Sequence, residues 1–299
     1  MDATVQITVL KDNTATRPGL SPGHGLAMLV EAGGRRVLFD TGPDESIVAN
    51  AAALGLSLYP LDAIVLSHGH YDHTGGLAAV LGVAGPVKVV AHPGIFDRTF
   101  SGPAPGELRA IGIPLPQGEY EALGARFELQ ELPVPLGDRL LTTGRVPPLH
   151  PGGQQRAGLW RNKGEAPHPD DFRDDCSLVA RLAECTAVLT GCAHAGLANI
   201  LCKSQTIVSD RPPRVLIGGL HMGWANDEEV ARTAREVANL GVAILMPCHC
   251  TGERAMEVLA EHFPGKVVPI GAGTVIRVHE HGDTEVRYPS GSVPSTEIR

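Results

Sequence analysis

The chain has 299 residues, of which 43% are hydrophobic, so it is long enough and apolar enough for a globular protein and is not a disordered one. Its 25 basic and 33 acidic residues give a formal net charge of -8 without a basic run, which argues against nucleic acid or an anionic membrane as a partner. No signal-peptide pattern opens the sequence, no apolar run has the length of a membrane span, and the six cysteines show no Cys-x-x-Cys spacing. We therefore expect a cytoplasmic protein with reduced thiols.

The first third of the chain alternates apolar runs with turn residues. Gly33 and Gly34 separate two apolar runs and predict a hairpin. Helical spacing follows the hairpin and leads into an apolar run that predicts a buried strand. The expected strands are residues 5–10, 26–31, 36–39, 61–66 and 87–91, and the expected helix is 46–54.

Residues 102–172 differ in character, because they hold eleven of the 24 prolines together with glycine and scattered charge. Residues 123–132 are compatible with strands, but much of the stretch has the composition of a long loop, and such loops are usually functional covers or disordered segments. We interpret the chain as one domain, residues 1–299, with a Pro/Gly-rich substrate cover inserted at about 102–172. Taken singly, each polar side chain of the cover fits a solvated position, but as a group they suit a pocket for an anionic substrate: Arg145, His150, Arg156, Trp160, Arg161, Lys163 and His168.

From residue 176 onward, strands and helices alternate regularly. The helix expected over 227–240 is amphipathic and has Asn226 or Asp227 as its N-cap. Two other helices are expected from Leu197 and from Glu253. The expected strands are 176–182, 187–190, 214–217, 242–246 and 267–278, the last broken by Gly271-Ala272-Gly273.

The densest chemistry of the sequence follows the buried strand at 61–66, where His68, His70, Asp72 and His73 lie within six residues. Neutral imidazole suits zinc, iron and similar metals, and a carboxylate adds charge. His68 and His70 alternate along an extended segment and point the same way, whereas Asp72 and His73 lie at a turn and can face a second ion. Solvated histidines on a surface loop are the alternative, which explains one histidine better than a cluster.

Three further strand ends deliver histidine, at His194, His221 and His249, each followed by a small or glycine-rich turn. If the strands run in register, these histidines converge with the first cluster on one rim, and six or seven ligands fit two ions better than one. Asp40 follows the strand at 36–39 and is expected to hold the free ring nitrogen of a ligating histidine. An ordinary Asp-Thr-Gly turn is the alternative for Asp40.

The run His68-Gly69-His70-Tyr71-Asp72-His73 matches the His-x-His-x-Asp-His signature of the metallo-β-lactamase superfamily, which the chain resembles. More narrowly, it is similar to the 7,8-dihydropterin-6-methyl-4-(ribofuranosyl)aminobenzene 5′-phosphate synthase-like, or dihydropteroate-synthase-related, subgroup. The resemblance implies an α/β fold, an αββα sandwich of two mixed β-sheets, with a dinuclear metal centre at one edge. The matching segments are residues 12–14, 24–26, 38–42, 67–77, 190–199, 218–221 and 247–252.

The resemblance also implies roles for individual residues. The expected ligands of the first ion are His68, His70 and His194, and those of the second are Asp72, His73 and His249. Cys192 stands where superfamily hydrolases usually carry a bridging aspartate, so it either ligates as a thiolate or packs as a small buried side chain. The usual behaviour of free cysteine favours packing. His221 has no certain counterpart and is an extra ligand, a proton donor to the leaving group, or a substrate contact.

The leading interpretation is a metal-dependent hydrolase in which a metal-bound hydroxide attacks a small ester, lactone or phosphoester, with Asp72 and His221 as catalytic residues. The expected cofactors are two divalent ions, zinc first, with iron and manganese as alternatives. A pterin-related transferase, a di-iron oxidoreductase and a non-catalytic metal sensor are the competing functions. The expected partner is a small and anionic molecule, and the sequence leaves the oligomeric state open.

Overall fold

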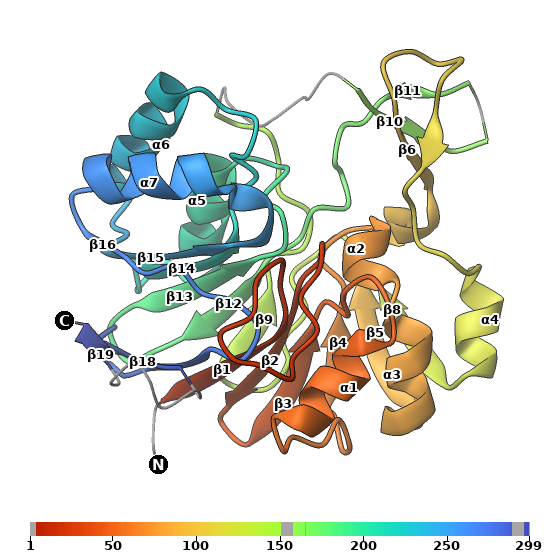
Figure 1. The fold of residues 1–299 in the computed structure, drawn as a ribbon, viewed down its shortest axis with the longest axis horizontal. Helices are drawn as coiled ribbons and strands as arrows, with labels where there is room; N and C mark the ends of the chain where they lie inside the picture. Colours follow the sequence, from red (N-terminus) through yellow and green to blue (C-terminus); the bar gives the residue numbers. More distant parts are fainter. Residues whose placement is uncertain (1–3, 151–157, 165, 289–295, 299) are drawn as a thin grey trace.

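The computed structural model describes residues 4–150, 158–164, 166–288 and 296–298. Two large sheets lie between two layers of helices (Figure 1). The nine-stranded sheet has the order β19-β18-β17-β1-β2-β3-β4-β5-β8. Its strands are β1 (Val5–Lys11), β2 (Ala27–Ala32), β3 (Arg35–Phe39), β4 (Ala63–Val65), β5 (Val87–Ala91), β8 (Ala125–Leu129), β17 (Val275–Val278), β18 (Thr284–Arg287) and β19 (Thr296–Ile298).

The second large sheet has six strands in the order β16-β15-β14-β13-β12-β9. They are β9 (Leu140–Thr142), β12 (Leu178–Arg181), β13 (Thr186–Thr190), β14 (Pro213–Gly219), β15 (Ile244–Cys248) and β16 (Lys266–Val267). A small sheet of order β11-β10-β6-β7 stands apart from both. It consists of β6 (Arg98–Ser101), β7 (Arg109–Ala110), β10 (Leu159–Asn162) and β11 (His168–Pro169).

Helices cover the outer face of each large sheet (Figure 1). The helices α1 (Ser46–Ala53) and α3 (Leu77–Ala84) pack on the nine-stranded sheet, with α4 (Gln117–Ala122) near its β8 edge. The helices α5 (Leu197–Ile207), α6 (Asp227–Asn239) and α7 (Glu253–His262) pack on the six-stranded sheet. The shortest helical pieces are α2 (Tyr71–Thr74), η1 (Pro93–Phe96) and η2 (His249–Thr251).

The core between the two sheets explains the apolar strands of the sequence. Val37 and Phe39 of β3 face Ala187 and Leu189 of β13 in one cluster, whereas the intervening Leu38 packs outward with the helices. Side chains of a strand alternate between its two faces, so a strand covered on both sides is apolar throughout. Both sheets contain parallel and antiparallel neighbours. The expected αββα sandwich of two mixed sheets is confirmed.

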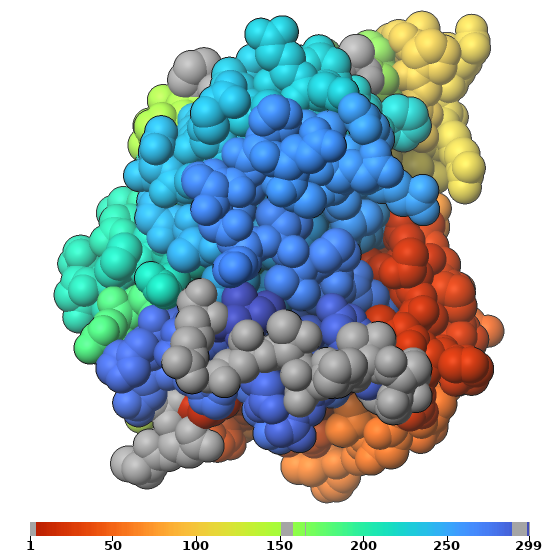
Figure 2. Space-filling view, turned by 60° about the vertical axis from the view of Figure 1, so that its left-hand side comes forward, coloured from red at the N-terminus to blue at the C-terminus, as the bar shows by residue number. Residues whose placement is uncertain are grey.

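The expected cover over 102–172 requires a correction, because two of its strands belong to the large sheets. β8 pairs with β5, and β9 pairs with β12. The prolines and glycines of this stretch delimit short strands, and a strand of three to five residues gives little periodicity of its own. What stands outside the sandwich is the small sheet, whose β6–β7 region protrudes at one edge of the molecule (Figures 1 and 2).

The last expected strand, 267–278, divides between the two sheets. β16 pairs with β15 in the six-stranded sheet, and β17 pairs with β1 in the nine-stranded sheet. The predicted break at Gly271–Gly273 is therefore where the chain crosses from one sheet to the other. No helix within the described ranges has both the length and the apolar character needed to cross a membrane.

Candidate metal centre

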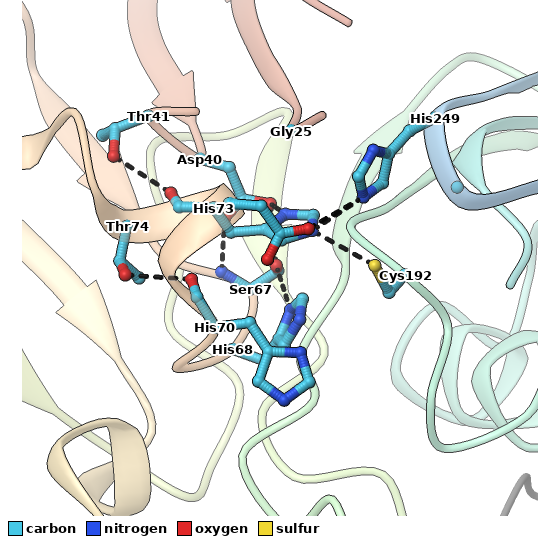
Figure 3. Close-up of polar contacts among 12 residues, drawn as sticks. Gly25, Asp40, Thr41, Ser67, His68, His70, His73, Thr74, Cys192 and His249 are labelled. Atoms are coloured by element: carbon cyan, nitrogen blue, oxygen red, sulfur yellow. Dashed lines mark hydrogen bonds and ion pairs between the residues drawn. The ribbon is translucent and has the colours of Figure 1, made fainter. Parts of the chain in front are cut away.

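The histidine cluster of the sequence lies in the loop that leaves β4 and in the short helix α2. The carbonyl of His70 accepts from His73 N at 3.1 Å and from Thr74 Oγ1 at 2.9 Å, which closes the helical turn. The carbonyl of His73 accepts from the backbone N of Thr41 at 2.8 Å and from its hydroxyl at 3.0 Å (Figure 3). These bonds fix Asp72 and His73 against the end of β3.

Two glycines after the cluster let this loop lie against the preceding loop. A Cβ on Gly75 would lie 2.0 Å from the carbonyl oxygen of Pro43, and one on Gly76 would lie 2.2 Å from that of Thr41. Any side chain would therefore force the two backbones apart. Gly75 and Gly76, which follow the signature, are thus a packing requirement of the loop that carries the histidines.

The six-stranded sheet supplies the other half of the site. Cys192 and His194 follow β13, His221 follows β14 and His249 follows β15. The three strands are parallel neighbours, so their carboxyl ends share one edge of the sheet. Backbone strain concentrates here, because His221 and His249 both have φ of 51° and Asp40, on the opposite sheet, has φ of 60°.

Side chains from the two sheets meet in two overlapping groups. In each group, the ligand atoms lie within 4.8 Å of one another. Cys192 is in both groups, which places its sulfur where a bridging ligand would lie. His70 joins through ring contacts, with centroids 4.6 Å from His68 and 5.0 Å from His194. The groups are Asp72, His73, Cys192 and His249, and His68, Cys192 and His194.

The donor atoms of the first group converge on His73. Its Nε2 lies 3.1 Å from Cys192 Sγ, 3.1 Å from His249 Nε2 and 3.5 Å from Asp72 Oδ2 (Figure 3). In the second group, His68 Nε2 and both ring nitrogens of His194 are buried without a hydrogen-bond partner among the described residues. Buried polar atoms normally have partners, so these orphaned nitrogens fit a bound ion.

Asp40, which follows β3, contacts His73 directly and His68 through the hydroxyl of Ser67. Its Oδ2 accepts from His73 Nδ1 at 2.7 Å and from Ser67 Oγ at 2.7 Å. The same Ser67 hydroxyl lies 2.9 Å from His68 Nδ1. Since a carboxylate only accepts, both imidazoles carry their proton on Nδ1 and keep the lone pair of Nε2 for a metal.

Electrostatics keep these groups in the protonation states that ligands need. Burial, together with neighbouring imidazoles, lowers the pKa of His68 and His194 well below the ordinary value, so both are neutral. Burial by itself would raise the pKa of Asp72, but His73, His24 and His249 outweigh it and hold that pKa well below its usual range. At His73, burial lowers the pKa but Asp72 and Asp40 outweigh it and raise the pKa to about 9, so this imidazole gives up a proton when it binds a metal.

Three residues of this site were not assigned a role by the sequence analysis. His24 Nε2 lies 3.1 Å from Asp72 Oδ2, and its side chain is 57% exposed at the mouth of the site. Asn13 Oδ1 accepts from His249 Nδ1 at 2.9 Å, and Asp12 Oδ1 accepts from His249 N at 2.8 Å. The available signal was an Asp-Asn pair at the end of the first strand and a His-Gly pair before the second.

His221 lies beside the second group without belonging to it. Its ring centroid is 4.2 Å from that of His194. The ring of Phe172 stacks on His194, with centroids 4.3 Å apart and an interplanar angle of 2°. His221 is only 8% exposed. It is therefore close enough to the cluster to contact a molecule bound there.

The cationic side chains expected to bind an anionic substrate do not act as one group. Arg161 is buried at 1% exposure and surrounded by carboxylates, so it is not available to a substrate. Arg145 is half exposed and lies 3.8 Å from Glu131. Trp160 donates to Gly102 O. Arg156 lies outside the described residues.

Comparison with known proteins agrees with this geometry. The model of the metallo-beta-lactamase superfamily matches residues 20–249. The chain is 28% identical over 263 residues to 7,8-dihydropterin-6-methyl-4-(beta-D-ribofuranosyl)-aminobenzene-5'-phosphate synthase of Methanocaldococcus jannaschii, and the match covers 85% of this chain and 90% of that protein.

Solved structures agree as well. Tm1679, described as a metal-dependent hydrolase of the beta-lactamase superfamily, has a TM-score of 0.78 and 29% identity, covering 92% of this chain and 99% of that one. The metallo-beta-lactamase fold protein YhfI from Bacillus subtilis shares the fold, with a TM-score of 0.55 and 14% identity over 93% of this chain and 100% of that one. The protein described here belongs to the metallo-β-lactamase superfamily.

Proposed function

We propose that the protein is a metal-dependent hydrolase that holds two divalent ions where the two sheets meet. The observation that carries this proposal is the convergence of ligand groups from opposite sheets around Cys192, where His68 Nε2 and both ring nitrogens of His194 have no hydrogen-bond partner among the described residues. Bound divalent ions supply Lewis-acid polarisation of a substrate oxygen and activation of water at neutral pH. Zinc suits this set of imidazole, carboxylate and thiolate donors, and iron and manganese are the alternatives.

Each of the two ions has its own set of ligands in the proposed site. In our assignment, the first ion takes His68, His70 and His194, and the second takes Asp72, His73 and His249. Cys192 belongs to both groups, so we assign its sulfur to the bridging position rather than to packing. Burial raises the pKa of the Cys192 thiol well above its ordinary value, so this thiol gives up its proton only when a cation is close.

Side chains around the ligands orient them and face the substrate. Asp40 and Asn13 hold the protonated nitrogens of His73 and His249, which fixes both ring planes. His221 is our candidate for donating a proton to the leaving group, because its ring lies against His194 at the edge of the cluster. The substrate class is a small ester, lactone or phosphoester.

A synthase that transfers a group to a pterin-like substrate is the second candidate. It is favoured by the relative that is 28% identical over 85% of the chain and carries a synthase name. The hydrolase is favoured by a structure that is 29% identical over 92% of the chain. A site of this kind supports either reaction class, since a fold does not fix its substrate.

Metal content and turnover test the proposal together. We expect protein purified without added metal to hold about two ions per chain by elemental analysis, and to hydrolyse activated esters or phosphodiesters in a chelator-sensitive way. Replacing His70 with alanine (His70→Ala) should abolish turnover and lower the metal content, because it removes a ligand from the first ion. If the protein does not hydrolyse generic esters or phosphodiesters but binds a pterin ring tightly, the synthase is favoured.

The matched control is His92→Ala. His92 is also a buried histidine at a strand end, 4% exposed after β5, but its Nδ1 accepts from Gly94 N at 2.9 Å and it is not one of the ligands that we assign to either ion. Metal content and turnover per folded molecule should not change in this variant. If His70→Ala retains full turnover, or wild-type protein binds no metal, the proposed function is wrong.

A further inference from the structure

Two adjacent carboxylates outside the ligand groups connect the two halves of the site. Asp174 and Asp175 precede β12 and are buried, at 2% and 1% exposure. The next residue, Cys176, donates its backbone N–H to Ser67 O at 2.9 Å. This short segment therefore lies directly against the loop that begins the histidine signature.

Each of the two carboxylates binds a different ligand loop. Asp174 Oδ2 accepts from the backbone N of Gly69 at 2.9 Å, and Gly69 lies between His68 and His70. Asp175 Oδ2 accepts from the backbone N of Ala195 at 2.6 Å, immediately after His194. The first loop comes from the nine-stranded sheet and the second from the six-stranded sheet. The adjacent residues thus span the boundary between the two sheets at the first ion.

Arg161 fixes Asp174 from the other side. Its guanidinium pairs with Asp174 Oδ1, with Asp170 at 2.9 Å and with Asp97 at 3.1 Å. Arg161 lies in β10 of the small sheet, so this ion-pair network joins that sheet to the metal loop. Hydrogen bonds with charged partners are stronger and more directional than neutral ones, which suits an anchor for backbone.

We propose that Asp174 and Asp175 are positioning residues that set the separation between the two loops bearing His68, His70 and His194, with Arg161 fixing Asp174. The ligands of the second ion have separate supports, because Asp40 holds His73 and Asn13 holds His249. The effect of the two aspartates is therefore selective for the first ion. This inference rests on the proposed function, since it requires the two ion sites.

Cobalt(II) binding measures the two sites separately. In a His249→Ala background the second site lacks a ligand, so Co²⁺ binding reports on the first site. In a His194→Ala background the first site lacks a ligand, so Co²⁺ binding reports on the second site. Adding Asp174→Asn or Asp175→Ala should weaken Co²⁺ binding at the first site by about 10–100-fold and shift its visible absorption bands. The same substitutions should leave the second site nearly unchanged. Asparagine at position 174 removes the charge that pairs with Arg161, and alanine at position 175 removes the oxygen that accepts from Ala195 N.

The matched control is Asp97→Asn, which removes a carboxylate from the same guanidinium; among the described residues, the Asp97 carboxylate has no hydrogen bond or ion pair to either ligand loop. It should leave both Co²⁺ affinities unchanged. The inference is overturned if Asp97→Asn weakens Co²⁺ binding at the first site as much as Asp174→Asn does. It is also overturned if Asp174→Asn weakens Co²⁺ binding equally at both sites, because the aspartate then has a role in stability only. If Asp174→Asn does not fold, Asp175→Ala decides by the same criterion, because it leaves the Arg161 ion pairs intact. Wild-type protein that binds no Co²⁺ refutes the proposed function instead.

Discussion

Asp175, which we propose as a positioning residue, lowers the stability of the fold at neutral pH. One of its oxygens accepts from Ala195 N, and the other is buried without a hydrogen-bond partner among the described residues. Burial raises the pKa of this carboxyl from 3.8 to about 7. The folded protein therefore keeps a proton here over a pH range in which the unfolded chain has lost it.

In chelator, which removes bound metal, the free energy of unfolding should depend on pH through the Asp175 carboxyl. Below about pH 4 both states are protonated and Asp175 has no effect; as pH rises towards about 7, the unfolded state binds fewer protons and the free energy of unfolding falls. Asp175→Asn removes this dependence. Urea denaturation in chelator at pH 4.5 to 8 should show the variant gaining stability relative to wild type as pH rises. A constant difference between the two proteins across that range would contradict the assignment.

Cys192 marks what residue chemistry alone does not reveal. The sequence favoured a packing role because buried cysteine is usually a small apolar side chain. In the structure this buried sulfur lies 3.1 Å from His73 Nε2 and belongs to both ligand groups. That position depends on how β13 meets the loop after β4, which is a contact between residues more than a hundred positions apart. Four of the six expected ligands, His68, His70, Asp72 and His73, were easier to propose because they lie in one local signature.

At the scale of elements, features that depend on neighbouring residues were predicted, and features that depend on distant partners were missed. The hairpin of β2 and β3 and the Asn226 cap of α6, which forms a capping box with Glu229, depend on neighbouring residues and were expected. The places of β8 and β9 at sheet edges depend on distant partners, β5 and β12. A short strand without a local partner has the composition of a loop, so the cover was drawn too wide.

The contact between the two sheets at the site depends on Gly191. A Cβ at this position would lie 2.1 Å from Ser67 Oγ and 3.0 Å from Asp40 Oδ2. Gly191→Ala should therefore push the end of β13 away from the first loop, lower metal content and turnover, and cost about 1–3 kcal/mol of stability. Elemental analysis and chemical denaturation measure both effects.

The control for this substitution is Gly82→Ala in α3, where a Cβ meets nothing within 4 Å. Removing a glycine from a helix should stabilise the protein by about 0.5–1 kcal/mol and leave metal content unchanged. If Gly191→Ala behaves like Gly82→Ala, the two loops have more freedom at this contact than the structure indicates.

At the scale of the whole molecule, the two sheets share one apolar core and meet again at the ligand groups. Residues of both sheets form the central cluster, which includes Ile7 and Phe39 from one sheet and Leu189 and Met246 from the other. At the edge, His68 and His194 come from opposite sheets, as do His73 and His249. Apolar contact joins the sheets in the interior, and metal coordination would join them at the rim.

An ion bound to ligands from both sheets stabilises only the folded chain, because the unfolded chain does not bring these residues together. The stabilisation is RT ln(1 + [ion]/Kd), about 2.7 kcal/mol at a free ion concentration of 100 Kd. Chelation should therefore lower the Tm of wild-type protein by several degrees, and added zinc should restore it in a concentration-dependent way. In a His70→Ala/His249→Ala double variant, which lacks one proposed ligand of each ion, neither treatment should change Tm. Calorimetry with elemental analysis of the same samples decides: if the metal leaves the wild type and Tm does not fall, the ions do not connect the two sheets.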